Sequence, residues 1–92
     1  MEDYFEWDFA KAALNVQKHG VDFETAKLVF KDKYRRIFLD IKHSQFEARY
    51  FCVGKVAGKI IKVRFVYRQG KIRIFGAGFW REGRKFYEKK EI

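Results

Sequence analysis

Residues 46–77, FEARYFCVGKVAGKIIKVRFVYRQGKIRIFGA, alternate between apolar and polar side chains and are interrupted by two short turn dipeptides. These dipeptides, Ala57-Gly58 and Gln69-Gly70, are typical of two-residue hairpin loops. Strands that are joined by such short loops run antiparallel. The stretch therefore predicts three consecutive antiparallel strands, over residues 46–56, 59–68 and 71–77.

Two-residue loops also predict which residues lie opposite one another. A loop at 69–70 places Phe75 opposite Arg64, and a loop at 57–58 places Phe51 opposite Arg64 and Glu47 opposite Arg68. Opposed residues point to the same side of a sheet. One side is then apolar and is the expected core, with Tyr50, Cys52, Ile61, Val63, Phe65, Tyr67, Ile72 and Ile74. The other side carries Glu47, Arg49, Phe51, Lys62, Arg64, Val66, Arg68, Lys71, Arg73 and Phe75.

Cations and aromatic rings are mixed on this second side. Arginine binds phosphate with a planar array of donors, and exposed rings stack on unpaired bases. We interpret this side as a nucleic-acid surface. The alternative is an ordinary solvated face with a cross-strand Glu47–Arg68 pair.

Helical patterns flank the predicted strands. An apolar stripe with a period of 3.6 predicts a helix over residues 8–19, with Asp8 as N-cap and Gly20 as the left-handed stop. A second helix is expected from Asp22 to about Asp32, a strand over 35–40, and a third helix from Phe79 to about residue 90. Residues 5–7 are expected to be extended, as a short first strand at most. The order predicts one α+β domain over residues 1–92, with two N-terminal helices, a four-stranded antiparallel sheet and a C-terminal helix.

Composition points to a polyanionic partner. The chain has 92 residues, a formal net charge of +9, 11 Phe, five Tyr and two Trp. Small domains that are this basic and this rich in aromatic residues commonly bind nucleic acid. The single Cys52 excludes an internal disulfide, and no Cys/His cluster has metal-site spacing, so neither a metal nor another cofactor is expected. No apolar run approaches the roughly 18–20 residues of a membrane span, and the acidic start is unlike a signal peptide. A cytoplasmic protein without a membrane partner is the expectation.

Several short motifs, in this order and at this spacing, resemble one protein family. The chain is similar to BrnT, a ribonuclease toxin family of bacterial type II toxin–antitoxin systems with a RelE-like fold. The motifs are Phe5-Glu6-Trp7-Asp8, Lys18-His19-Gly20-Val21, Asp40 with His43-Ser44, Glu47 with Arg49-Tyr50, and Ile72-Arg73-Ile74. One departure is Gly76-Ala77-Gly78, where many members carry Ser-Ala-Arg. If that arginine stabilises charge during cleavage, this chain must use another, such as Arg81 or Arg84, or be a weaker enzyme.

The resemblance implies cleavage of RNA, with messenger RNA as the expected substrate, and neutralisation by a small antitoxin of the BrnA type. It also implies that operator DNA is bound only through the antitoxin. RNA carries its own nucleophile, the 2′-hydroxyl, so cleavage needs only alignment, proton transfer and charge stabilisation. A ribonuclease that works without metal is therefore the expected activity, and inhibition of translation is its expected effect.

The candidate site residues come from the second side of the sheet and its surroundings. For catalysis we expect Arg49, Arg64 and Arg73 as phosphate ligands, Glu47 as base, and Tyr87 or His43 as acid. For RNA binding we expect Phe51, Lys62, Arg68, Lys71, Phe75, Arg81 and Arg84. A non-catalytic RNA- or DNA-binding module would use the same surface, and a protein that binds only an acidic partner is a third class.

Overall fold

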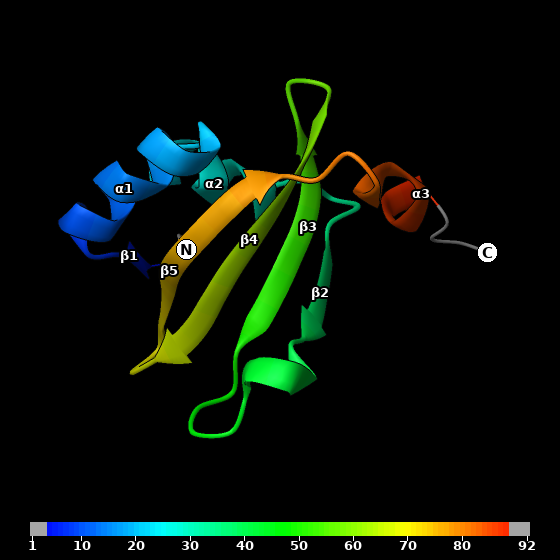
Figure 1. Cartoon of the computed structure of the whole chain (residues 1–92). Helices are drawn as coiled ribbons and strands as arrows, with labels where there is room; N and C mark the ends of the chain where they lie inside the picture. Colours follow the sequence, from blue (N-terminus) through cyan, green and yellow to red (C-terminus); the bar gives the residue numbers. More distant parts are fainter. Residues whose placement is uncertain (1–3, 89–92) are drawn as a thin grey trace.

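The computed structural model describes residues 4–88, in which five strands form one sheet with helices on both sides (Figure 1). The strand order across the sheet is β1-β5-β4-β3-β2. In chain order the elements are β1 (Phe5–Glu6), α1 (Phe9–His19), α2 (Phe23–Val29), β2 (Arg36–Leu39), the 3₁₀ turn η1 (Ile41–His43), β3 (Tyr50–Val56), β4 (Lys59–Arg68), β5 (Lys71–Phe79) and α3 (Gly83–Glu88). The α+β class is confirmed.

Local capping explains where the first two helices begin and end. The Asp8 carboxylate accepts hydrogen bonds from the backbone N–H groups of Ala10 and Lys11, and Gly20 ends α1 in the left-handed region with φ 74°. The Asp22 carboxylate caps α2 through the Thr25 N–H. The second helix is shorter than predicted and ends at Val29.

Both predicted hairpins are present. The central residues of each loop, Ala57-Gly58 and Gln69-Gly70, all have positive φ, which matches the right-handed twist of the strands. Across β3 and β4 the register is as predicted, with Phe51 opposite Arg64. Only β3 starts later than expected, at Tyr50.

A β-bulge changes the second half of the β4–β5 ladder. Val66 lies opposite Arg73 as predicted, but the register then shifts, and Arg64 lies opposite Gly76. The predicted Arg64–Phe75 pair is wrong, because β5 has one residue more than β4 at this point. Strand β5 then continues to Phe79, two residues beyond its predicted end at Ala77.

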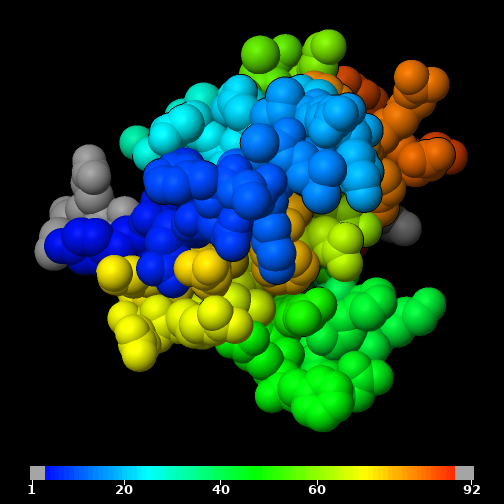
Figure 2. Space-filling model, turned by 60° about the vertical axis from the view of Figure 1, so that its left-hand side comes forward, coloured from blue at the N-terminus to red at the C-terminus, as the bar shows by residue number. Residues whose placement is uncertain are grey.

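The prediction of four antiparallel strands also needs correction. Residues Phe5 and Glu6 form a fifth strand, β1, which pairs in parallel with β5 opposite Ile72 and Arg73. Figure 2 shows this N-terminal segment, in blue, against the yellow turn that joins β4 and β5. The third helix starts at Gly83 because Phe79 still belongs to the sheet. Its predicted end near residue 90 lies outside the described residues.

Hydrophobic packing occurs on both sides of the sheet. The main core is the predicted apolar side with α1 and α2 packed on it, including Phe23, Val29, Cys52, Val63, Phe65 and Ile74. Tyr67, also predicted for this core, is exposed, because it lies near the end of β4 beyond the cover of the helices. On the other side, α3 covers a smaller cluster of Val53, Ile60 and Tyr87, flanked by Phe38, Trp80 and Phe86. The second side is therefore open only toward β5 and the β2–β3 loop. Among residues 4–88, no helix is long and apolar enough to cross a membrane.

Candidate RNA-binding and cleavage site

The open part of the second side is a charged surface, which we call the basic face. Strands β3, β4 and β5 and the end of the β2–β3 loop contribute its side chains. They are Glu47, Arg49, Phe51, Lys62, Arg64, Arg68, Lys71, Arg73 and Phe75. All were predicted for this side.

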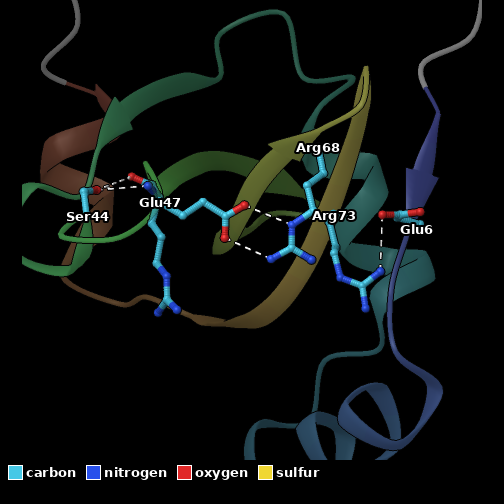
Figure 3. A network of polar contacts seen from close by, with 6 residues as sticks. Glu6, Ser44, Glu47, Arg68 and Arg73 are labelled. Carbon is cyan, nitrogen blue, oxygen red and sulfur yellow. Dashed lines mark hydrogen bonds and ion pairs between the residues drawn. The ribbon is translucent and has the colours of Figure 1, made fainter.

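Two of its arginines are held by carboxylates (Figure 3). The Arg68 guanidinium donates two hydrogen bonds to Glu47, each 2.9 Å long. Hydrogen bonds from Arg68 hold the pKa of Glu47 below its usual range, so this carboxylate is ionised at neutral pH. Arg73 lies 3.2 Å from Glu6, whose other oxygen is 3.8 Å from the Lys71 ammonium. These pairs fix the side chains of Arg68 and Arg73 on the face.

Two further arginines lie on one aromatic ring. The guanidinium carbons of Arg49 and Arg64 are 5.0 Å and 5.5 Å from the centre of the Phe75 ring. The Nε atom of Arg64 is buried, and no atom of residues 4–88 accepts a hydrogen bond from it. Guanidinium groups bind phosphate through a planar array of donors, so Arg49 and Arg64 together are candidate phosphate ligands.

A groove of about 410 Å³ lies beside Arg64. Within it, the Lys62 ammonium is 4.1 Å from the centre of the Phe51 ring and 4.5 Å from that of Trp80. The floor is β5, where Gly76 leaves space: a Cβ there would lie 3.4 Å from Cδ of Arg64. The structure thus brings a cation, two flat rings and open backbone together, as a single-stranded nucleic acid requires.

The β2–β3 loop builds a second, smaller hollow of about 150 Å³, lined by His43, Gln45, Phe46, Glu47 and Arg49. Three predicted site residues from one short segment, His43, Glu47 and Arg49, therefore surround the same space. In Figure 2 this loop is the green segment that projects from the body of the molecule.

Hydrogen bonds within the loop hold this arrangement. The His43 Nδ1 atom lies 3.0 Å from Oδ2 of Asp40, a residue that is only 7% exposed. The Ser44 hydroxyl donates to the Asp40 carbonyl at 2.6 Å and accepts from the Arg49 N–H at 2.9 Å. The loop is thereby tied to the start of β3.

Tyr87 lies at the other end of the sheet. Its hydroxyl donates a 2.6 Å hydrogen bond to Asp32, and its ring packs against Val53 and Ile60. Burial, together with this bond, raises the pKa of Tyr87 to about 12. Burial alone would raise the pKa of Asp32, but the Tyr87 hydroxyl and two backbone N–H groups lower it. The structure therefore does not bring Tyr87 to the hollow around His43.

Arg81 and Arg84 also lie away from that hollow. Both line a groove of about 350 Å³ between the β3–β4 turn and α3. Arg84 is bound to Glu88 at 3.0 Å and to the Gly58 carbonyl at 3.3 Å. The structure therefore does not bring Arg81 and Arg84 to the β2–β3 loop.

Sequence reasoning did not assign roles to Glu6, Asp40 or Ser44. For Asp40 a signal exists: it precedes His43 by three residues, and side chains three apart lie above one another in a 3₁₀ turn. Glu6 has no such signal, because its contact with Arg73 depends on the parallel pairing of β1.

Comparison with known protein families identifies a relationship. A family model described as the ribonuclease toxin, BrnT, of type II toxin–antitoxin systems matches residues 7–82. This range contains the whole basic face and the whole β2–β3 loop, but not Glu6, which binds Arg73. No curated protein matches the chain.

Proposed function

The chain belongs to the BrnT family of ribonuclease toxins, and on this premise we propose that it cleaves RNA without a metal ion, at the hollow beside the β2–β3 loop. The observation that carries this proposal is that His43, Glu47 and Arg49 line one space. A group able to transfer a proton, a carboxylate and a phosphate ligand are thus next to each other. The aromatic groove beside Arg64 offers a place for the neighbouring nucleotides.

In the proposed reaction the 2′-oxygen of the RNA attacks the adjacent phosphorus, and the bond from phosphorus to the 5′-oxygen breaks. His43 accepts the 2′-hydroxyl proton and returns it to the departing 5′-oxygen. Arg49 and Arg64 neutralise the charge that develops on the phosphoryl oxygens. The products are a 2′,3′-cyclic phosphate and a 5′-hydroxyl.

Glu47 has a binding role in this scheme. Because Arg68 occupies both of its oxygens and lowers its pKa, it is a weak base. Its function is to hold Arg68 on the face, where that guanidinium contacts the RNA backbone together with Lys71 and Arg73. Tyr87 has no part in the proton transfer we propose.

The biological setting follows from the family. As a toxin of a type II system, the protein has a cognate antitoxin. We propose messenger RNA as the substrate, arrest of translation in the cytoplasm as the effect, and an antitoxin of the BrnA type, through which operator DNA is bound. Ile41 and Phe46, on the loop that forms the hollow, are among the most exposed apolar side chains of residues 4–88. An antitoxin that buries them would close the site.

The test is incubation of the purified protein with RNA in EDTA, with a DNA copy of the same sequence as control. We expect RNA fragments that end in 2′,3′-cyclic or 3′-phosphate, and intact DNA, because only RNA has the 2′-hydroxyl. Cleavage that depends on magnesium, or cleavage of the DNA, would contradict the mechanism. Binding of RNA without cleavage would support the non-catalytic nucleic-acid-binding module instead.

A further inference from the structure

Asp40 is a buried carboxylate whose side chain has no role in capping. It precedes the turn η1, yet its side chain accepts no hydrogen bond from that turn's backbone N–H groups. Burying a carboxylate is unfavourable unless a polar partner compensates it. Within the described part of the chain, the His43 ring is the hydrogen-bond partner of this carboxylate, at 3.0 Å.

This contact determines which ring nitrogen of His43 carries the proton. An ionised carboxylate only accepts hydrogen bonds, so the Nδ1 atom beside Asp40 must be the donor. In the neutral ring the lone pair is then on Nε2. His43 is about half exposed and lines the hollow with Glu47 and Arg49, so that lone pair is open to a bound molecule.

Backbone hydrogen bonds hold Asp40 close to Arg49, the proposed phosphate-binding residue. Its N–H donates to the Arg49 carbonyl at 2.7 Å. The Ser44 hydroxyl joins the Asp40 carbonyl to the Arg49 N–H. Asp40, which orients His43, and Arg49, which directly precedes β3, are therefore tied together through their backbones.

We infer that Asp40 is a positioning residue for the cleavage reaction, which holds His43 in the Nδ1–H form with Nε2 directed to the substrate. This inference rests on the function proposed above. The charged groups around the imidazole are Asp40 and the neighbouring Lys42 on its own turn, and Glu47 and Arg49 across the hollow. Of these four described residues, only Asp40 is hydrogen-bonded to the ring.

A double-variant cycle tests the coupling, with RNA cleavage as the readout. His43→Ala should lower kcat by about 10²–10⁴-fold, the usual contribution of a positioned acid–base group. Asp40→Asn keeps the shape of the side chain but no longer requires Nδ1 to be the donor, and should lower kcat with little change in KM. In the His43→Ala background, Asp40→Asn should have no further effect. Independent, multiplying losses would overturn the inference.

A second readout does not depend on activity. Nitrogen-15 NMR of the two histidines reports which ring nitrogen is protonated, and His19 serves as the internal reference. We expect the Nδ1–H form for His43 in the wild type and its loss in Asp40→Asn. Asp32→Asn is the matched control, because it removes a carboxylate on the far side of the fold and should leave the His43 signal unchanged.

The two readouts separate the possible failures. An unchanged His43 tautomer in Asp40→Asn would refute the positioning role even if the protein cleaves RNA. If the His43 tautomer changes in Asp40→Asn but the wild-type protein cleaves no RNA, the proposed function is refuted and, with it, the role of Asp40 in cleavage.

Discussion

Replacing Tyr87 with Phe separates a structural role from a catalytic one. The change removes the 2.6 Å hydrogen bond to Asp32 and keeps the ring, which is 5% exposed, in its packing site. A hydrogen bond to a charged group contributes about 1.5–3 kcal/mol to the free energy of unfolding. Asp32 keeps the backbone N–H groups of Lys55 and Tyr34 at 2.7 Å and 3.0 Å, so it is not left unpaired. We therefore expect a loss of about 2 kcal/mol, near the lower end of that range.

For a domain of this size, 2 kcal/mol corresponds to a fall in Tm of roughly 8–16 °C. Thermal unfolding followed by circular dichroism measures it, and Tyr4→Phe, at an exposed site, is the matched control. Cleavage per folded molecule at 25 °C should not change, since Tyr87 lies away from the hollow around His43. A large loss of cleavage at unchanged Tm would show that Tyr87 is the catalytic acid and would refute this reasoning.

The same bond makes a prediction about pH. Because the folded protein raises the pKa of Tyr87 to about 12, the stability gained from its protonated form is complete below the ordinary tyrosine pKa, about 10. That stability is lost as the pH rises from about 10 toward 12. The difference in unfolding free energy between wild type and Tyr87→Phe should therefore be constant from pH 7 to 9 and decrease above about pH 10. If the difference in unfolding free energy stays constant up to pH 12, the raised pKa of Tyr87 is contradicted.

Three further expectations concern the basic face, the core and the cell. Arg64→Ala and Arg73→Ala should each reduce RNA cleavage by more than tenfold with a small change in Tm. Ile74→Ala, at a fully buried site, should instead lower the unfolding free energy measured by urea titration by about 2–5 kcal/mol. Arginine variants that cut RNA normally would place the active surface elsewhere. Gly54→Ala should destabilise by roughly 1–3 kcal/mol, because the new Cβ would lie 3.0 Å from the Val29 carbonyl, and an unchanged urea midpoint would show that α2 can move aside. Expression of the chain alone should arrest bacterial growth and co-expression of the neighbouring small reading frame should restore it; normal growth with abundant folded protein would count against the toxin.

Much of the fold could be predicted because its signals are local. Caps such as Asp8 and Gly20 mark helix ends, and each turn dipeptide specifies the register of a whole hairpin. The bulge in β5 could not be predicted in this way, because an extra residue leaves the alternation around Phe75 almost unchanged. The pairing of β1 depends on residues far apart in the sequence, and a two-residue strand has no period to detect.

The candidate site was predictable to the same degree. Strand alternation identified the basic face, including Arg49, Arg64 and Phe75. It did not show that α3 covers one end of that side, because Val53 and Ile60 look like ordinary strand residues. The position of Tyr87 depends on how α3 packs on the sheet, so it could not be predicted from the sequence. The role of Asp40 depends on the path of a loop, which hydrophobic periodicity does not describe.

The parallel pairing of the first and last strands has a consequence during synthesis. The Glu6–Arg73 contact joins residues 67 positions apart, so a nascent chain carries β1 unpaired until β5 has left the ribosome. Contacts between distant segments form late in folding. A partly synthesised chain thus lacks the bonds that hold Arg73 and Lys71 in place, and a chain truncated before β5 lacks Lys71, Arg73 and Phe75 of the basic face. The groove beside Arg64 is therefore incomplete until β5, which forms its floor, has paired with β4.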